Sequence, residues 1–121
     1  KHAIEGYSES LDHELRTMGI RVSVIEPAFM KTAIDANSRD ADAKLDAYRD
    51  VRIAMDARLK EMLDVAEEPD VVADTVLKAA SAASPKARYT AGTAAARLRL
   101  MHTLLPASLL DAGIRKQLRI A

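Results

Sequence analysis

The segment at residues 26–32 holds the residue types best placed for chemistry, because it directly follows a compact, β-branched stretch. Pro27 lacks a backbone N–H and has a fixed φ, so it directs the chain out of a sheet and frees the next backbone groups to face a ligand. Thr32 adds a hydroxyl group to the same segment. Ligands of open parallel sheets bind at the carboxyl ends of the strands, which makes this segment a candidate binding site. A plain structural turn is the alternative that these residues leave open.

Several other kinds of site are excluded or disfavoured by the residue types present. The sequence contains no cysteine, which rules out a thiolate nucleophile, a disulfide framework and a cysteine-based metal centre. His2, His13 and His102 lie far apart without a second ligand at metal-binding spacing, so we expect surface or helix-capping roles and no metal site. Tyr48 and Met55 are expected to cover apolar surface, with contact to a substrate as the alternative.

The composition is that of one soluble domain or of part of one. Of 121 residues, 49% are hydrophobic and 30% are charged, with 18 basic against 18 acidic side chains. Balanced charge, no tryptophan and a single phenylalanine argue against a nucleic-acid partner. The uncharged run at residues 103–110 is far shorter than the roughly 20 apolar residues that cross a bilayer. We therefore expect no transmembrane segment and a cytoplasmic protein.

The elements that must position the candidate segment begin at the start of the chain. Apolar residues recur every three to four positions over residues 3–18, which predicts an amphipathic helix. Gly19 is the expected left-handed residue at its end. Residues 20–25 are β-branched and compact, and they predict a strand that is buried on both faces and closed by Pro27. A helix and a strand joined this closely are typical of a parallel sheet covered by helices.

The two faces of this first helix carry different residues. Acidic side chains, including Glu5, Glu9 and Asp12, fill one face, and we expect that face to be solvated. Tyr7 lies on the apolar face, where it is expected to pack in a core or against another helix.

The rest of the chain predicts four more helices and a second strand. Residues 32–42 are polar and small and predict a mobile loop. The remaining predicted elements are a helix over residues 45–62 with Asp42 as a candidate N-cap, a helix from Pro69 to the Ser84-Pro85 pair, a strand at residues 87–90, a helix from a capping Thr93 to Leu105, and a last amphipathic helix after Pro106 that reaches Leu118.

Charge is unevenly divided along the chain. Residues 1–85 carry 11 basic and 17 acidic side chains, a net charge of −6, whereas residues 86–121 carry 7 basic and 1 acidic, a net charge of +6. The basic tail favours a helix packed on its own domain with a solvated basic face. Docking on a partner or peripherally on a membrane surface is the alternative.

Residues 1–34 resemble the second half of a classical short-chain dehydrogenase/reductase. The resemblance rests on residues 1–11, the Glu14-Leu15 pair, residues 19–22 and the stretch from Ile25 to Thr32. In that family a Tyr-x-x-x-Lys motif precedes a strand and a Pro-Gly-x-x-x-Thr motif follows it. Lys1 matches the motif lysine, and Pro27 with Thr32 matches the second motif at the family's spacing.

The resemblance implies an NAD- or NADP-dependent interconversion of an alcohol and a carbonyl. Lys1 would hold the ribose of the nicotinamide and lower the pKa of the family's proton-transferring tyrosine. The backbone at Met30, following Pro27, and the hydroxyl of Thr32 would bind the carboxamide. Residues 35–66 would form a substrate lid, and residues 67–121 the last helix–strand unit and the basic tail. The resemblance also implies a homodimer or homotetramer and, within the family, similarity to the steroid- and retinoid-like branches with their apolar substrates.

This sequence departs from the family pattern in several features. Ala28 stands where the family has glycine, and neither the glycine-rich phosphate loop, the family serine nor the catalytic tyrosine is present. Tyr7 lies six residues after Lys1 rather than four before it, so it does not replace that tyrosine. Helical periodicity begins at once, without an initiator methionine, so we expect a piece of a longer protein that is inactive alone.

The fold class that follows is α/β, the carboxyl-terminal portion of a Rossmann-type doubly wound parallel sheet, with about two strands and four to five helices in this chain. The predicted function is that of an oxidoreductase. A non-enzymatic interaction module, built on an exposed strand edge and the basic tail, is the alternative from another class. Cofactor binding distinguishes the two, because an interaction module has no need of it.

Overall fold

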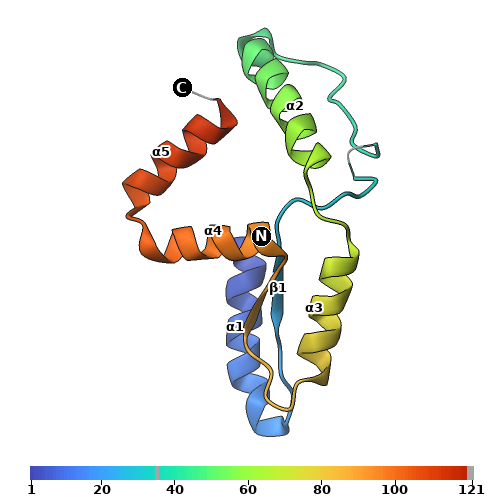
Figure 1. The fold of residues 1–121 in the computed structure, drawn as a ribbon, viewed down its shortest axis with the longest axis vertical. Helices are drawn as coiled ribbons and strands as arrows, with labels where there is room; N and C mark the ends of the chain where they lie inside the picture. The colour runs from blue at the N-terminus through green and yellow to red at the C-terminus, as the bar shows by residue number, and fades with distance from the viewer. Residues whose placement is uncertain (35, 120–121) are drawn as a thin grey trace. The chain divides into compact units, whose positions relative to one another are not determined.

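A computed structural model describes residues 1–34 and 36–119 (Figure 1). It divides the chain into two compact units. The first unit consists of Lys1–Ala28 and Pro69–Ala96, and the second of Phe29–Glu68 and Arg97–Ala121.

The first unit is built around a pair of parallel strands. Strand β1 (Val24–Pro27) pairs with strand β2 (Arg88–Ala91), and the register places Val24 opposite Arg88 and Pro27 opposite Ala91. Parallel strands require a long crossover connection, which the chain between β1 and β2 supplies. The predicted parallel α/β arrangement is therefore confirmed, and β2 lies one residue later than expected.

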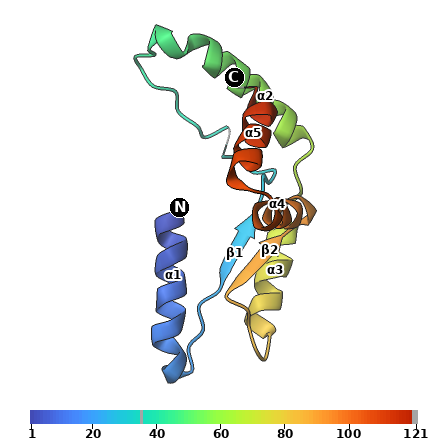
Figure 2. The same ribbon diagram turned by 90° about the vertical axis from the view of Figure 1, so that its left-hand side faces the viewer.

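Helices lie on both faces of this strand pair (Figure 2). Helix α1 (His2–Leu15) continues as the short 3₁₀ helix η1 (Arg16–Met18) and ends at Gly19, whose φ of 75° is left-handed as predicted. Helix α3 (Asp70–Ser81) begins directly after Pro69, where the missing N–H costs no helical hydrogen bond, and it packs against both strands. It ends three residues before the predicted Ser84-Pro85 stop.

The buried core of this unit is small. Among the described residues, the buried hydrophobic side chains are those of Ala79 on α3, Ala91 on β2 and Ala95 in the first turn of helix α4 (Thr93–Leu104). The prediction that the first strand is buried on both faces was wrong for this chain. Residues 24–26 of β1 are half-buried and Pro27 is exposed, because among the described residues only one neighbouring strand and parts of two helices cover them. The strand also begins four residues later than predicted.

The second unit consists of a loop and helices. After the irregular residues that follow β1, the 3₁₀ helix η2 (Asp46–Tyr48) leads into helix α2 (Arg49–Asp64). The prediction of Asp42 as an N-cap was wrong, because α2 begins seven residues later and its N-cap is Tyr48. Asp42 lies in the irregular segment, where helical bonding has not begun.

Helix α4 continues into this unit, and helix α5 (Ala107–Leu118) follows it after Pro106. Thr93 is the first residue of α4, and Gly92 precedes it with a φ of 90°. Helices α2 and α5 are in contact, and the Nε of Arg58 donates a hydrogen bond of 3.0 Å to the carbonyl of Gln117. Within the described residues, no helix combines the length and apolarity needed to cross a bilayer.

Candidate functional site

The backbone of Lys1 starts helix α1. Its carbonyl accepts hydrogen bonds from the N–H groups of Ile4 at 2.9 Å and Glu5 at 3.1 Å, so the position of Lys1 is set by the helix. The residue is exposed, and within the described part of the chain its ammonium group forms no ion pair. Lys1 therefore presents a cation that a ligand can use.

Pro27 is the last residue of β1, as the sequence predicts. Because β1 and β2 are parallel and Pro27 pairs with Ala91, both strands end at the same edge of the sheet. The chain leaves the sheet there as Ala28 and Phe29. This is the edge at which ligands of parallel α/β sheets bind.

A backbone bridge holds the segment after Pro27 in the second unit. Met30 forms an isolated parallel bridge with Glu67, in which the N–H of Lys31 donates to the Glu67 carbonyl at 3.0 Å. The Nζ of Lys31 also lies 2.9 Å from a carboxylate oxygen of Glu68. The N–H used in this bond belongs to Lys31, so the bond leaves the amide of Met30 available. Thr32 is exposed directly after it.

The Met30 amide and the Thr32 hydroxyl, both in the second unit, are groups of the kind that can bind a carboxamide. A carboxamide has both donors and an acceptor, and a backbone amide together with a hydroxyl group offers both partners. Lys1 and Pro27 belong to the first unit, whereas Met30 and Thr32 belong to the second.

Helix α1 directs Glu5, Glu9 and Asp12 toward the sheet, so the prediction of a solvated acidic face was wrong for these residues, whereas Glu14 is exposed as predicted. Asp12 is only 1% exposed and accepts hydrogen bonds from the Nε of Arg21 and the N–H of Val22, both at 2.9 Å, and from Arg16. Hydrogen bonds from Arg21, then Arg16, hold the pKa of the Asp12 carboxyl well below its usual range. Asp12 therefore fixes the end of α1 to the chain that enters β1.

A second cluster ties the beginning of α1 to the strands. The Nε of Arg88 on β2 lies 2.6 Å from Glu9, its Nη1 lies 3.2 Å from Glu5, and Nη1 also contacts Glu26 of β1. Neither cluster was predicted from the sequence. The signal that could have found them is an arginine inside each segment predicted as a strand, because a partly buried guanidinium needs a carboxylate partner.

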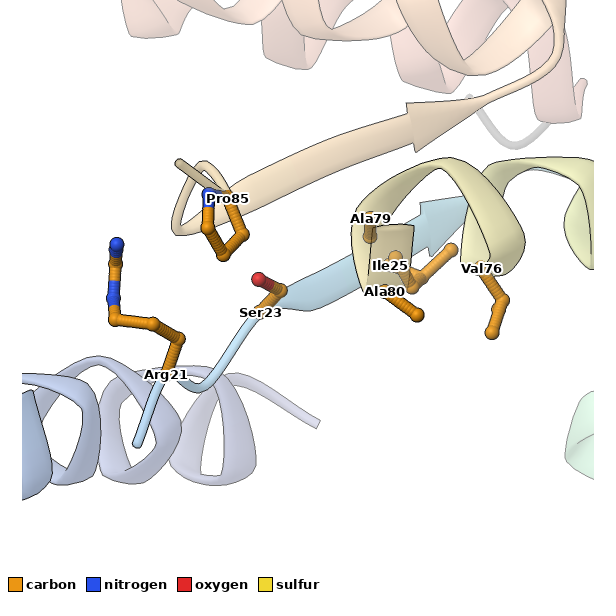
Figure 3. Close-up of a pocket in the computed structure, with 7 residues that line it drawn as sticks. All are labelled: Arg21, Ser23, Ile25, Val76, Ala79, Ala80 and Pro85. Atoms are coloured by element: carbon orange, nitrogen blue, oxygen red, sulfur yellow. The ribbon is translucent and has the colours of Figure 1, made fainter. Parts of the chain in front are cut away.

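A pocket of about 310 Å³ lies in the first unit (Figure 3). Its lining is mostly aliphatic and comes from β1, α3 and the segments before each strand: Arg21, Ser23, Ile25, Val76, Ala79, Ala80 and Pro85. The hydroxyl of Ser23 donates a hydrogen bond of 2.8 Å to the Lys86 carbonyl, so it is already engaged. The pocket lies toward the beginning of β1 and does not include Pro27.

The remaining residues singled out in the sequence lie at the surface. His2, His13 and His102 are exposed, as expected, and the described residues contain no cluster able to hold a metal ion. Tyr7 is 67% exposed, so it does not pack in a core of this chain. Its alternative role, contact with another helix, remains a prediction.

The parallel strand pair with helices on both faces, and the segment that follows Pro27, define an α/β protein of the doubly wound parallel type. Comparison with curated proteins gives a 34% identical match to an oxidoreductase of Schizosaccharomyces pombe, described as uncharacterized, over 76% of this chain and 39% of that protein. The NADPH-dependent 3-dehydrocapnine reductase of Ornithobacterium rhinotracheale is 30% identical over 98% of this chain and 43% of its own length. Human retinol dehydrogenase 16 is 29% identical over 93% of this chain and 39% of its own length. No family model matches the chain.

These similarities place the chain in the short-chain dehydrogenase/reductase family, as its motifs predict. The chain spans about two fifths of the length of the curated relatives that it matches. The relatives are named oxidoreductases, dehydrogenases and reductases.

Proposed function

We propose that the protein carrying this chain is an NAD(P)-dependent oxidoreductase that interconverts an alcohol and a carbonyl. The observation that carries the proposal is the segment after β1, where the chain leaves the carboxyl end of a parallel strand pair and the bridge to Glu67 leaves the Met30 amide available. The names of the relatives support the same reaction class. The name of the Ornithobacterium rhinotracheale protein specifies NADPH.

The cofactor, when bound, supplies or accepts the hydride. Lys1 would bind the hydroxyls of the nicotinamide ribose and place a positive charge beside a proton-transferring tyrosine, which lowers the pKa of that tyrosine. The Met30 backbone, directed by Pro27, and the Thr32 hydroxyl would orient the carboxamide. In this scheme Lys1 is the catalytic residue within the chain, and Lys1, Pro27, Met30 and Thr32 form its share of the cofactor site.

The chain by itself is proposed to be inactive. The tyrosine four residues before Lys1 and the glycine-rich phosphate loop are absent from its sequence, and both are needed for the reaction. Within a single Rossmann-type domain, residues 1–34 would carry the half-motifs, residues 35–66 the substrate lid, and residues 67–121 the last helix–strand unit. Residues 35, 120 and 121 of these ranges lie outside the described residues.

The proposed substrate is a small apolar alcohol or carbonyl compound. Phe29 beside the cofactor segment is 47% exposed, and several leucines of α4 and α5 are exposed in the second unit. Retinol dehydrogenases and a 17-beta-hydroxysteroid dehydrogenase are among the relatives, and their names indicate apolar substrates. We propose a cytoplasmic protein that acts on this substrate class and has no nucleic-acid partner.

Turnover by the longest natural protein that contains this sequence tests the proposal. Retinol, a hydroxysteroid and short aliphatic alcohols are each supplied with NAD or NADP, and reduced nicotinamide is followed by absorbance. Formation of reduced cofactor with at least one alcohol class supports an oxidoreductase. Absence of both turnover and cofactor binding would favour the interaction module instead.

A further inference from the structure

One arginine joins three elements of the first unit. The guanidinium of Arg88 on β2 contacts Glu5 and Glu9 of α1 and Glu26 of β1, and the side chain is only 24% exposed. We call these four residues the Arg88 clasp. The planar guanidinium carries five N–H donors, so one arginine can bind several carboxylates where a lysine cannot do so with fixed geometry.

The clasp follows from strand register and helix periodicity. Arg88 lies opposite Val24, and Glu26 lies two residues further along β1, so both side chains belong to the same face of the sheet. Ile25, between them, lies in the pocket lined by α3 on the other face. Glu5 and Glu9 are four residues apart and therefore share one face of α1. Figure 2 shows the strand pair between α1 and α3.

Two glutamates of the clasp, one on α1 and one on β1, are each directly connected to a residue of the proposed cofactor site. The backbone N–H of Glu5 donates to the carbonyl of Lys1 at 3.1 Å, and Glu26 directly precedes Pro27 in the chain. A rotation or slide of α1 would therefore change the position of Lys1 relative to the end of β1, and the clasp opposes that movement.

The charge on Arg88 does not vary under working conditions. Hydrogen bonds to Glu9, then Glu26, raise the pKa of the Arg88 guanidinium above its already high ordinary value. Arg88 therefore stays charged across the pH range in which an enzyme is assayed.

We propose that Arg88 is a positioning residue, which sets Lys1 at the start of α1 relative to Pro27 at the end of β1. This proposal rests on the proposed function, because that function assigns Lys1 and Pro27 to the cofactor site. Arg88 itself touches neither the cofactor nor the substrate in this scheme. It acts through the two glutamates of α1 and through Glu26.

Arg21 provides a matched control for Arg88, because it forms an ion pair whose role is structural only. Its side chain is 27% exposed, close to the 24% of Arg88, and it also ties α1 to the sheet through a carboxylate, Asp12. However, Asp12 lies at the opposite end of α1 from Lys1. Loss of Arg21 removes a tether of the same kind without releasing the beginning of the helix.

The experiment compares Arg88→Gln, Arg88→Lys and Arg21→Gln in the longest natural protein that contains this sequence. The Kd values of NADH and NADPH are measured by fluorescence titration, and hydrogen–deuterium exchange is measured for the amides in the first three turns of α1 without cofactor. A Glu5→Gln/Glu9→Gln double variant releases α1 while keeping Arg88 and Glu26 together, so the comparison survives if Arg88→Gln does not fold.

The proposal predicts that Arg88→Gln and the double variant speed amide exchange at the beginning of α1 and weaken cofactor binding about tenfold or more. Arg88→Lys should recover part of the loss, and Arg21→Gln should affect exchange mainly at the other end of the helix, with little change in Kd. Equal losses of cofactor binding in Arg21→Gln and Arg88→Gln, or an unchanged Kd in a folded Arg88→Gln protein, would overturn it.

The same experiment separates this proposal from the proposed function. If the unchanged protein binds neither NADH nor NADPH, the proposed function fails, and the positioning role of Arg88 fails with it, although the exchange data still report whether the clasp holds α1. If the unchanged protein binds cofactor but the first turns of α1 exchange equally in all variants, the clasp proposal alone fails.

Discussion

At the scale of single residues, the charged side chains of α1 show that a sequence pattern can be recognised correctly while its environment in the fold is predicted wrongly. Periodicity separates an acidic face from an apolar face, but it does not say which face meets the sheet. Besides Arg16, which lies four positions from Asp12, the partners of Glu5, Glu9 and Asp12 include Arg88 and Arg21, which lie 9 to 83 positions away in the sequence. Such long-range ion pairs leave little local signal, and so the acidic face was expected to be solvated.

Asp12→Asn should make the stability of the fold less dependent on pH in the acidic range. Because the folded pKa of Asp12 is depressed, its carboxylate stabilises the fold above the unfolded value of about 3.9, and this contribution is lost as pH falls through the folded value. We expect the variant to be less stable than the unchanged protein at neutral pH, with a difference that shrinks below about pH 4.

Urea unfolding at neutral and acidic pH measures this difference. Asp74→Asn is the matched control, since Asp74 is an exposed acid of α3 in the same unit and should change stability little at any pH. A stability loss in Asp12→Asn that is identical at neutral and acidic pH would show that the ion pairs of Asp12 are not its cause.

Lys1→Ala should cut turnover of the longest natural protein containing this sequence about 100-fold or more, because it removes both a ribose contact and a positive charge from the proposed site. The fold should remain intact, since Lys1 is exposed and its backbone carbonyl still starts α1. Steady-state kinetics and circular dichroism measure the two effects. Lys78→Ala, an exposed lysine on α3, should leave turnover unchanged, and equal activity of the two variants would remove Lys1 from the mechanism.

At the scale of elements, the best predicted features are those with a local chemical cause. Gly19 ends the first helix because it accepts a left-handed φ, and Pro69 starts α3 because the first helical position needs no N–H. The start of α2 was missed, because an acidic residue such as Asp42 is equally compatible with a loop. The early residues of the predicted strand, 20–23, have strand-forming side chains but no paired neighbour.

Gly19→Ala should destabilise the protein by about 1 kcal/mol, because an L-residue in left-handed backbone is strained although the space beside Gly19 is open. Gly6→Ala tests the opposite case on the same helix. Gly6 lies within α1, also with open space beside it, so alanine should stabilise by about 0.5–1 kcal/mol. Thermal unfolding of both variants measures the effects, and a shift of the same sign in both would contradict the assignment of Gly19 as the helix stop.

At the scale of the whole molecule, the chain exposes much apolar surface for its size. Among the described residues, only three alanines form the buried hydrophobic core, whereas large side chains such as those of Ile4 and Tyr7 are 69% and 67% exposed. The fold class could be predicted from the sequence because each helix and strand has its own periodicity. The surface that covers these apolar side chains could not be predicted, because the spacing of apolar residues does not identify the surface against which they pack.

We predict that the longest natural protein containing this sequence forms a homodimer or homotetramer in which the apolar face of α1 is covered. Tyr7→Glu places a charge on that face and should shift the protein toward monomer in light scattering, because burying an unpaired carboxylate is unfavourable. His13→Glu, at an exposed position away from Ile4 and Tyr7, should leave the assembly unchanged. A monomeric unchanged protein at micromolar concentration would refute the prediction.

Cofactor binding by the longest natural protein containing this sequence decides between an oxidoreductase and an interaction module. The measurement is a titration of the unchanged protein and of Thr32→Val with NADH and NADPH, followed by fluorescence or calorimetry. We predict saturable binding of at least one reduced cofactor and binding that is several-fold weaker without the Thr32 hydroxyl, as expected for one lost hydrogen bond. Absence of binding of either cofactor at millimolar concentration would contradict the proposed function.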